Sequence, residues 1–358
     1  MGEMRAARLG IMTPKLRVVG VWVMLVVVCA FVTMAFFTPS QSSHRGINSL
    51  LKFSFVPSIK GWAMKPFVYR ALVPQTIALV LKVLPDSLER SAAQGVAGSQ
   101  ALSGVFKRLK WETDYALAYV VCTILVYLMF LFFALYASRL ILATNGISAS
   151  ASAHRLLGSA VLLGLPPFFK FTSFLYDPAQ LVLFTASLYY IFKRRWVPYL
   201  VFFTLTCINK ETAILLIPIF VLTYPGRLSD RLSKQILLAQ AGIFALVKAV
   251  LAIAFRDNPG PFMEFHLFDH NLNVLAGGYG WSPFLLLAIL ALVLLYGWNE
   301  KPPFLKIAFA FTLPALVVIS LFVGWIDEWR VYYEAYPVVF AMAVHTFRSL
   351  SRPRALNP

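Results

Sequence analysis

The charged residues of this chain are sorted between its apolar segments, and this sorting constrains the fold more than any single motif. Dividing the chain into apolar spans of about 20 residues gives loops that alternate between basic and acidic. With the N-terminus placed inside, the inner segments hold 17 of the 32 basic residues and three of the 15 acidic residues. Because inner loops of membrane proteins carry an excess of Lys and Arg, this pattern predicts a cytoplasmic N-terminus.

The composition excludes an ordinary soluble domain. The mean hydropathy is +0.74, 59% of the residues are hydrophobic and 13% are charged. Soluble domains are about 45–50% apolar and about 25% charged. The net charge of +17 is spread over short loops, where membrane topology and anionic lipid headgroups account for it, so we expect no nucleic-acid partner.

We predict an all-α, polytopic transmembrane bundle of about ten spans, with residues 1–358 forming one integral membrane domain. The predicted segments are a first span at 17–37, an outer loop at 38–114, an interfacial segment within it at 67–84, the remaining spans at 115–347 and a cytoplasmic tail at 348–358. If the interfacial segment crossed the membrane, every later loop would be inverted. We therefore expect this segment to lie in the interface or to re-enter from the outside, and its Arg70 and Lys82 can snorkel from an interfacial helix.

Polar residues recur at the predicted outer ends of the spans, and they supply the candidate site residues. Charged groups there are costly in hydrocarbon unless they are paired, hydrated or functional. The candidate catalytic carboxylates are Asp177, Glu211, Asp327, Glu328 and Asp114. The candidate substrate-binding residues are Arg70, Lys210, Arg330, Tyr176, Tyr333 and Glu334.

These candidates also have structural interpretations. Asp177 is followed by proline, as at a helix start with Asp at the N-cap and Pro at the first helical position. Lys210 and Glu211 fit a turn whose charges neutralise each other. Arg70 fits either a snorkelling arginine or a ligand of a lipid phosphate, because guanidinium forms paired bonds with phosphate oxygens. The segment 327–334 contains three acids and an arginine, which exceeds what an aromatic belt at the membrane surface requires.

A run of two imidazoles and two carboxylates, EFHLFDH, occupies residues 264–270 of a predicted outer loop. These groups can ligate divalent metals. Their spacing matches no strong metal signature, and an amphipathic turn is the simpler interpretation. We therefore expect no metal site and no cofactor.

Four short pieces carry a resemblance to a known class of proteins. They are FVYRALVP at 67–74, YDPAQLVLF at 176–184, NKETAILLIP at 209–218 and DEWRVYYEAYP at 327–337. With the predicted layout, they resemble the GT-C class of membrane glycosyltransferases and related bacterial envelope-polysaccharide proteins. Those enzymes usually carry an acidic residue in the first outer loop soon after the first helix. In this chain no acid of that loop precedes Asp86, so the resemblance leaves the position of a catalytic carboxylate open.

The resemblance implies a multi-pass protein of the bacterial inner (plasma) membrane. Its implied reaction transfers a sugar from a polyprenyl-phosphate carrier to a glycan or lipid acceptor at the outer face. A carboxylate base would activate the acceptor hydroxyl, and cations would hold the departing phosphate. The alternatives are an O-antigen-type polymerase or ligase, and a transporter or flippase of an envelope precursor. Transporters gather polar groups near the bilayer midplane, whereas a surface enzyme gathers them at the ends of its spans.

Overall fold

The protein is described here from a computed structural model that covers residues 14–38, 55–169, 173–224, 229–277 and 281–351. Every regular element in these segments is helical. Four helical segments are long and apolar enough to cross a membrane: Val18–Phe37, Thr113–Thr144, Arg231–Ala254 and Pro303–Phe322. The all-α prediction is therefore confirmed for the described residues, and so is the presence of helices fit for a membrane. Residues 39–54 of the predicted outer loop and 352–358 of the predicted tail lie outside the described residues.

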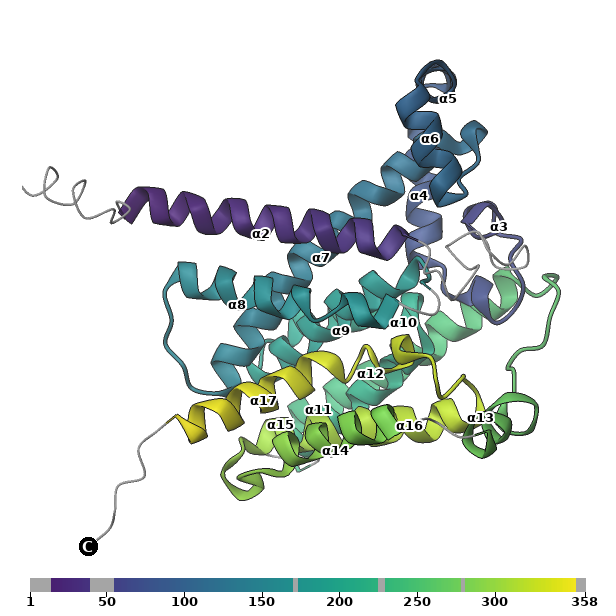
Figure 1. Ribbon diagram of the computed structural model, residues 1–358. Coiled ribbons are helices and arrows are strands. Elements are labelled where there is room, and N and C mark those ends of the chain that lie inside the picture. Colours follow the sequence, from purple (N-terminus) through teal and green to yellow (C-terminus); the bar gives the residue numbers. More distant parts are fainter. Residues whose placement is uncertain (1–13, 39–54, 170–172, 225–228, 278–280, 352–358) are drawn as a thin grey trace, which may run out of the picture.

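The longer helices run side by side in a bundle (Figure 1). They are α2 (Pro14–Phe37), α7 (Ala116–Thr144), α8 (Ala151–Leu163), α9 (Tyr176–Phe192), α10 (Trp196–Asn209), α11 (Leu216–Thr223), α12 (Arg231–Ala254), α14 (Trp281–Leu295), α15 (Pro303–Ala310), α16 (Leu313–Phe322) and α17 (Tyr336–Leu350). The start of α2 and the end of α17 lie at one end of the bundle. The opposite end carries α3 (Phe55–Lys60), α4 (Leu72–Val83) and α13 (Leu272–Ala276), and we call it the α13 end.

Short helical turns connect these elements. They are η1 (Phe67–Tyr69), η2 (Thr113–Tyr115), η3 (Pro166–Phe169), η4 (Glu211–Leu215), the π-helical turn η5 (Leu267–Asn271), η6 (Trp298–Glu300) and η7 (Trp329–Tyr332). Two further helices, α5 (Asp86–Gly98) and α6 (Gln100–Leu109), project from the bundle near α4 (Figure 1). The predicted interfacial segment 67–84 is therefore two elements, because the chain leaves helical geometry at Arg70 between η1 and α4.

Helix α9 forms the centre of the bundle. All of its side chains from Tyr176 to Leu188 are buried. Helices α7 and α10 pack along it, and α11 and α4 also contact it. A helix that is apolar on every side is buried rather than half exposed. Its first turn therefore delivers Tyr176 and Asp177 into the interior of the α13 end.

A glycine sets the closest approach between α7 and α8. A Cβ added to Gly158 of α8 would lie 2.9 Å from the carbonyl oxygen of Ala134 in α7. Membrane helices approach closely where one of them carries a small residue. The glycine thus lets these two helices pack backbone against backbone.

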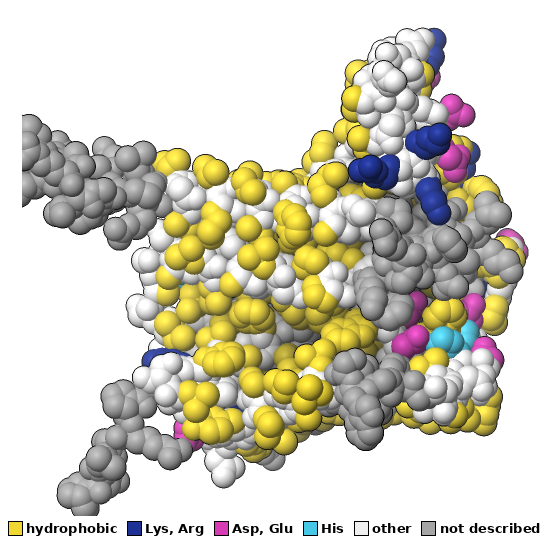
Figure 2. Space-filling view, viewed as in Figure 1, with side chains coloured by type: hydrophobic (Ala, Val, Ile, Leu, Met, Phe, Trp, Pro, Cys, Tyr) yellow, Lys and Arg dark blue, Asp and Glu magenta, His cyan; other side chains and the backbone are white. Residues whose placement is uncertain are grey.

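Apolar side chains cover much of the side of the bundle that is in view, and the charges in view gather mainly toward the α13 end (Figure 2). Helix α2, for example, exposes 57% of Val19, 58% of Val27 and 55% of Phe31. Soluble proteins rarely expose contiguous apolar patches of this kind. This distribution suits a bundle whose sides face lipid and whose end faces water.

Candidate functional site

Charged and polar side chains from four separate segments meet at the α13 end. We define the charged cluster as Arg70, Tyr176, Asp177, Lys210, Glu211, Glu328, Arg330 and Glu334. These residues come from the loop after η1, the first turn of α9, the junction of α10 with η4, and the chain around η7. The structure thus brings most of the candidate residues into one place.

Two guanidinium groups converge on the phenol oxygen of Tyr176. Arg70 donates a hydrogen bond to this oxygen, and Arg330 donates from Nη1 at 3.4 Å. The guanidinium of Arg70 also lies 4.5 Å from the Tyr176 ring centroid, and that of Arg330 lies 4.1 Å from the Phe174 ring centroid. Aromatic faces stabilise nearby cations, so these rings hold both guanidiniums in place.

Each of the two arginines also has a carboxylate partner. Nε of Arg70 lies 3.4 Å from Oε2 of Glu211, and Arg330 pairs with Glu328. Burial of Arg330 opposes its charge, but Glu328 and then the Tyr176 oxygen outweigh that effect and raise its pKa above the ordinary value. For Arg70 the Tyr176 oxygen and Glu211 likewise outweigh burial and raise the pKa. Both guanidiniums therefore keep their charge.

A buried ion pair forms the other side of the cluster. Nζ of Lys210 lies 3.0 Å from Oε1 of Glu334, and the two side chains are 8% and 0% exposed. The hydroxyl of Thr212 also donates to Oε1 of Glu334, and Gln180 donates to Thr212 at 3.2 Å. Buried charges are tolerated where they are paired and hydrogen-bonded, and this network supplies both conditions.

Asp177 is 1% exposed, and its carboxylate belongs to no ion pair within 4 Å among the described residues. Its Oδ2 accepts a hydrogen bond from the backbone N–H of Phe174 at 3.0 Å. Its Oδ1 has no hydrogen-bond partner in the described part of the chain. The charges that act on it most strongly are those of Arg330, Lys210 and Arg70.

The prediction that Asp177 caps its helix is wrong. Helix α9 begins one residue earlier, at Tyr176, with Leu175 at the N-cap position. An N-cap side chain accepts from a residue further along the helix, whereas the Asp177 carboxylate bonds backward to Phe174. The carboxylate therefore faces the cluster rather than the first turn of its helix.

Several buried polar atoms in this region have no hydrogen-bond partner among the described residues. They are Asp177 Oδ1, Asn209 Oδ1, Glu211 Oε1, Arg330 Nε, Tyr333 Oη and Glu334 Oε2. Each buried group left unsatisfied costs about 1–3 kcal/mol. Their concentration at one place is typical of a binding site rather than of a structural core.

A small pocket borders the cluster. Its lining includes Phe55, Phe67, Arg70, Phe174 and Tyr176. The rings of Phe67 and Phe174 are stacked 5.6 Å apart, and those of Phe174 and Tyr176 are stacked 5.3 Å apart. The pocket is thus lined by aromatic rings and by the guanidinium of Arg70, one of the two that converge on Tyr176.

Tyr333 is a candidate residue outside the charged cluster, and its ring packs against the bundle. Its ring is 1% exposed and stacks on Phe168 at 5.6 Å. Its hydroxyl has no hydrogen-bond partner among the described residues. The candidate tyrosine thus packs against the bundle while its polar atom remains available.

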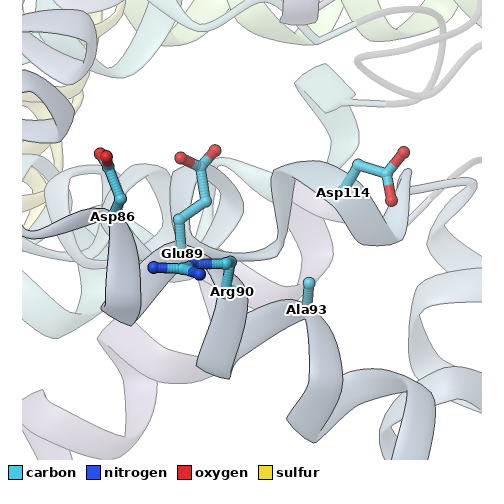
Figure 3. A pocket seen from close by; sticks show the side chains of 5 residues that line it. All are labelled: Asp86, Glu89, Arg90, Ala93 and Asp114. Atoms are coloured by element: carbon cyan, nitrogen blue, oxygen red, sulfur yellow. The ribbon is translucent and has the colours of Figure 1, made fainter.

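Two candidate carboxylates lie outside the charged cluster. Asp327 accepts from His270 at 2.8 Å, and His270 stacks on Trp325 at 4.3 Å. Asp114 borders an open groove between α5 and η2, together with Asp86 and Glu89 (Figure 3). No hydrogen bond or ion pair within the described segments joins either carboxylate to the cluster.

The two imidazoles of residues 264–270 form hydrogen bonds with carboxylates. His266 lies between Asp269, 3.1 Å from Nδ1, and Glu264, 3.4 Å from Nε2. The described residues contain no group of three or more His, Cys, Asp or Glu arranged to hold a metal.

The candidate site residues do not include the polar residues that support the cluster. Asn209 donates to the backbone oxygen of Tyr176 at 2.9 Å and to Gln180 at 3.0 Å. Lys248 of α12 donates to the carbonyl of Cys207 at 2.9 Å and contributes to the electrostatic field at Glu211. The sequence signal that could have identified them is an amide or ammonium group within an apolar helix. Such groups are costly in hydrocarbon unless they have partners.

No protein-family model, curated protein or solved structure matches this chain.

Proposed function

We propose that this protein is a membrane glycosyltransferase that uses a polyprenyl-phosphate-linked sugar. The observation that carries the proposal is the buried Asp177 carboxylate, which lies without an ion pair in the described chain, beside two guanidiniums that converge on one phenol oxygen. A carboxylate base and a cationic phosphate site are the two groups that glycosyl transfer from a lipid phosphate requires.

Each group has a defined role in the proposed reaction. Asp177 takes the proton from the acceptor hydroxyl, whose oxygen then bonds to the anomeric carbon of the donor sugar. The bond between that carbon and the phosphate oxygen breaks, and the electron pair leaves with the lipid phosphate. Arg70 and Arg330 hold the phosphate, because guanidinium forms paired bonds with its oxygens. Lys210 adds positive charge near the base.

The proposal places the protein in a bacterial inner membrane, with about ten spans and a cytoplasmic N-terminus. The four long apolar helices support a membrane location. The alternation of basic and acidic loops supports the orientation. In this orientation the α13 end faces away from the cytoplasm, and the glycan or lipid acceptor approaches from that side.

The position of the charged cluster favours a surface enzyme over a carrier. The cluster lies where helices begin and end, at the first turn of α9 and directly after the last residue of α10. Carriers bind their substrates near the midplane of the bilayer, between broken helices. An O-antigen-type polymerase or ligase would use the same lipid carrier, and the acceptor distinguishes it from a single-sugar transferase.

Mass spectrometry tests the proposal directly. Lipid-linked glycans and surface polysaccharide from a deletion strain are compared with those from the same strain carrying the wild-type gene. We expect the deletion strain to lose one sugar from the surface glycan and to accumulate a lipid-linked precursor. Identical lipid-linked and surface glycans in the two strains would refute glycan transfer.

A further inference from the structure

The helices α5 and α6 form a hairpin that projects sideways from the bundle at the α13 end, crosswise to α2 (Figure 1). It contacts the bundle through its inner residues. Phe106 is 7% exposed and packs edge-on against Trp111 and Tyr119, and Leu109 is 5% exposed. The hairpin is therefore anchored by one part of its apolar face.

The same apolar face continues beyond the bundle. At 100° per residue, Leu102 and Val105 lie on the face of α6 that carries Phe106 and Leu109. Yet Leu102 is 47% exposed and Val105 is 44% exposed. Nearby, Leu88 of α5 is 47% exposed, and Val83 at the end of α4 is 78% exposed.

The charges of the hairpin lie elsewhere on its surface. Lys107 and Arg108 are exposed and fall outside the apolar face of α6, and α6 contains no acidic residue. The acids of the hairpin, Asp86 and Glu89, lie in the first turn of α5. Figure 2 shows apolar side chains on the flank of the projection that is turned toward the spans, and most charges on the opposite flank. The apolar flank is thus turned toward the space beside α2, a helix whose exposed side chains are also apolar.

We propose that the α5–α6 hairpin lies on the surface of the bilayer and that Lys107 and Arg108 bind anionic lipid headgroups. An amphipathic helix with a basic polar face binds in the interface between headgroups and acyl chains, with its apolar face buried. Basic residues next to the membrane add electrostatic attraction to anionic lipid. The hairpin fixes the depth of the α13 end in the membrane, and this inference does not depend on the proposed reaction.

A pair of spin-labelled variants tests this placement in the full-length protein. The native cysteines of the described chain are buried and are replaced by alanine. One label is placed at Leu102→Cys and the matched control at Gly104→Cys. Gly104 is exposed on the opposite face of α6, and an added Cβ there meets nothing within 4 Å. The protein is reconstituted in vesicles of phosphatidylglycerol and phosphatidylcholine, and collision with oxygen and with a water-soluble nickel complex is measured for each label.

We expect the ratio of oxygen to nickel accessibility to be several-fold higher at position 102 than at position 104. Replacing phosphatidylglycerol by phosphatidylcholine in the vesicles should lower the ratio at position 102. The double change Lys107→Gln/Arg108→Gln should lower this ratio equally in vesicles that contain phosphatidylglycerol. Equal ratios at the two positions would refute membrane contact. A ratio that is insensitive to both changes would refute headgroup binding. Protection at position 102 that disappears on dilution of the protein in the vesicles would identify a second copy as the occupant and overturn the proposal.

Discussion

Lys210 and Glu334 form an ion pair with Nζ 3.0 Å from Oε1, and both side chains are almost completely removed from solvent. The pair joins the end of α10 to the turn before α17. Charges in such a position stabilise each other only as a pair, since an isolated buried charge is strongly unfavourable. The contact therefore holds together segments that are far apart in the chain and that both contribute to the charged cluster.

Substitution of Lys210 by methionine should strongly destabilise the protein. Removing one partner of a buried pair costs about 3–5 kcal/mol, because the remaining charge has no compensation. The measurement is the free energy of unfolding in detergent micelles. The matched control is Arg256→Gln, since Arg256 and Asp257 form a pair whose side chains are 76% and 90% exposed. Equal stability of the two variants would contradict the importance of the buried pair.

Asp177→Asn should abolish glycan transfer while the protein remains folded in the membrane. The asparagine oxygen can still accept from Phe174 N–H, but an amide cannot act as a base. General-base catalysis contributes about 10²- to 10⁴-fold, so we expect a rate loss of that order. The readout is restoration of the surface glycan in the deletion strain, with membrane protein quantified by immunoblot. Asp257→Asn, at a carboxylate whose side chain is 90% exposed, should restore the glycan normally. Full restoration by Asp177→Asn would exclude Asp177 as the base.

Alanine should have opposite effects at two helical glycines. Gly158→Ala brings a Cβ to 2.9 Å from the carbonyl oxygen of Ala134 and forces α7 and α8 apart. Overpacking of this kind costs about 1–3 kcal/mol. Gly242→Ala in α12 meets nothing within 4 Å and should be neutral or stabilising, because alanine favours helix more than glycine does. Unfolding midpoints of the two variants in the same detergent decide between these expectations.

The turn η5 should lose its local order at low pH. The hydrogen bond with His266 lowers the pKa of Asp269 below its ordinary value of 3.8. Because the folded-state pKa is the lower one, the carboxylate stabilises the turn fully above the ordinary value, and this contribution is lost as the pH falls through the lowered value. Asp269→Asn should therefore speed amide hydrogen exchange in residues 264–271 at pH 7 and have a smaller effect at a pH well below 3.8. An equal effect at both pH values would contradict a role for the charge.

The sequence located most of the charged cluster but not its pairing. The structural interpretation of Lys210 and Glu211 has them neutralise each other as chain neighbours, yet Lys210 pairs with Glu334 and Glu211 with Arg70. Polar residues at the ends of apolar segments can be recognised from the local sequence, because they stand out against the apolar run that they flank. Their partners depend on how the helices pack against one another, and no local pattern encodes that packing.

The same limit explains the two carboxylates that lie elsewhere. Asp327 and Glu328 are adjacent in the sequence, but one pairs with His270 and the other with Arg330. Successive residues in a turn point in different directions. Composition does not record these directions, and it therefore assigned both carboxylates to one site. Asp114 was a candidate because it lies in the predicted first outer loop, and the structure places it before α7 and beside α5, outside the charged cluster.

The buried pair between Lys210 and Glu334 also imposes an order on biosynthesis. Chains are made from the N-terminus, so α9, α10 and the ammonium of Lys210 are synthesised long before Glu334 leaves the ribosome. Until then Lys210 lacks its native counterion, and η7 has not yet supplied Arg330. The emergence of α17 is thus the event that completes both the bundle and its charged cluster. A nascent chain stalled before residue 334 should carry an unpaired ammonium that is open to water.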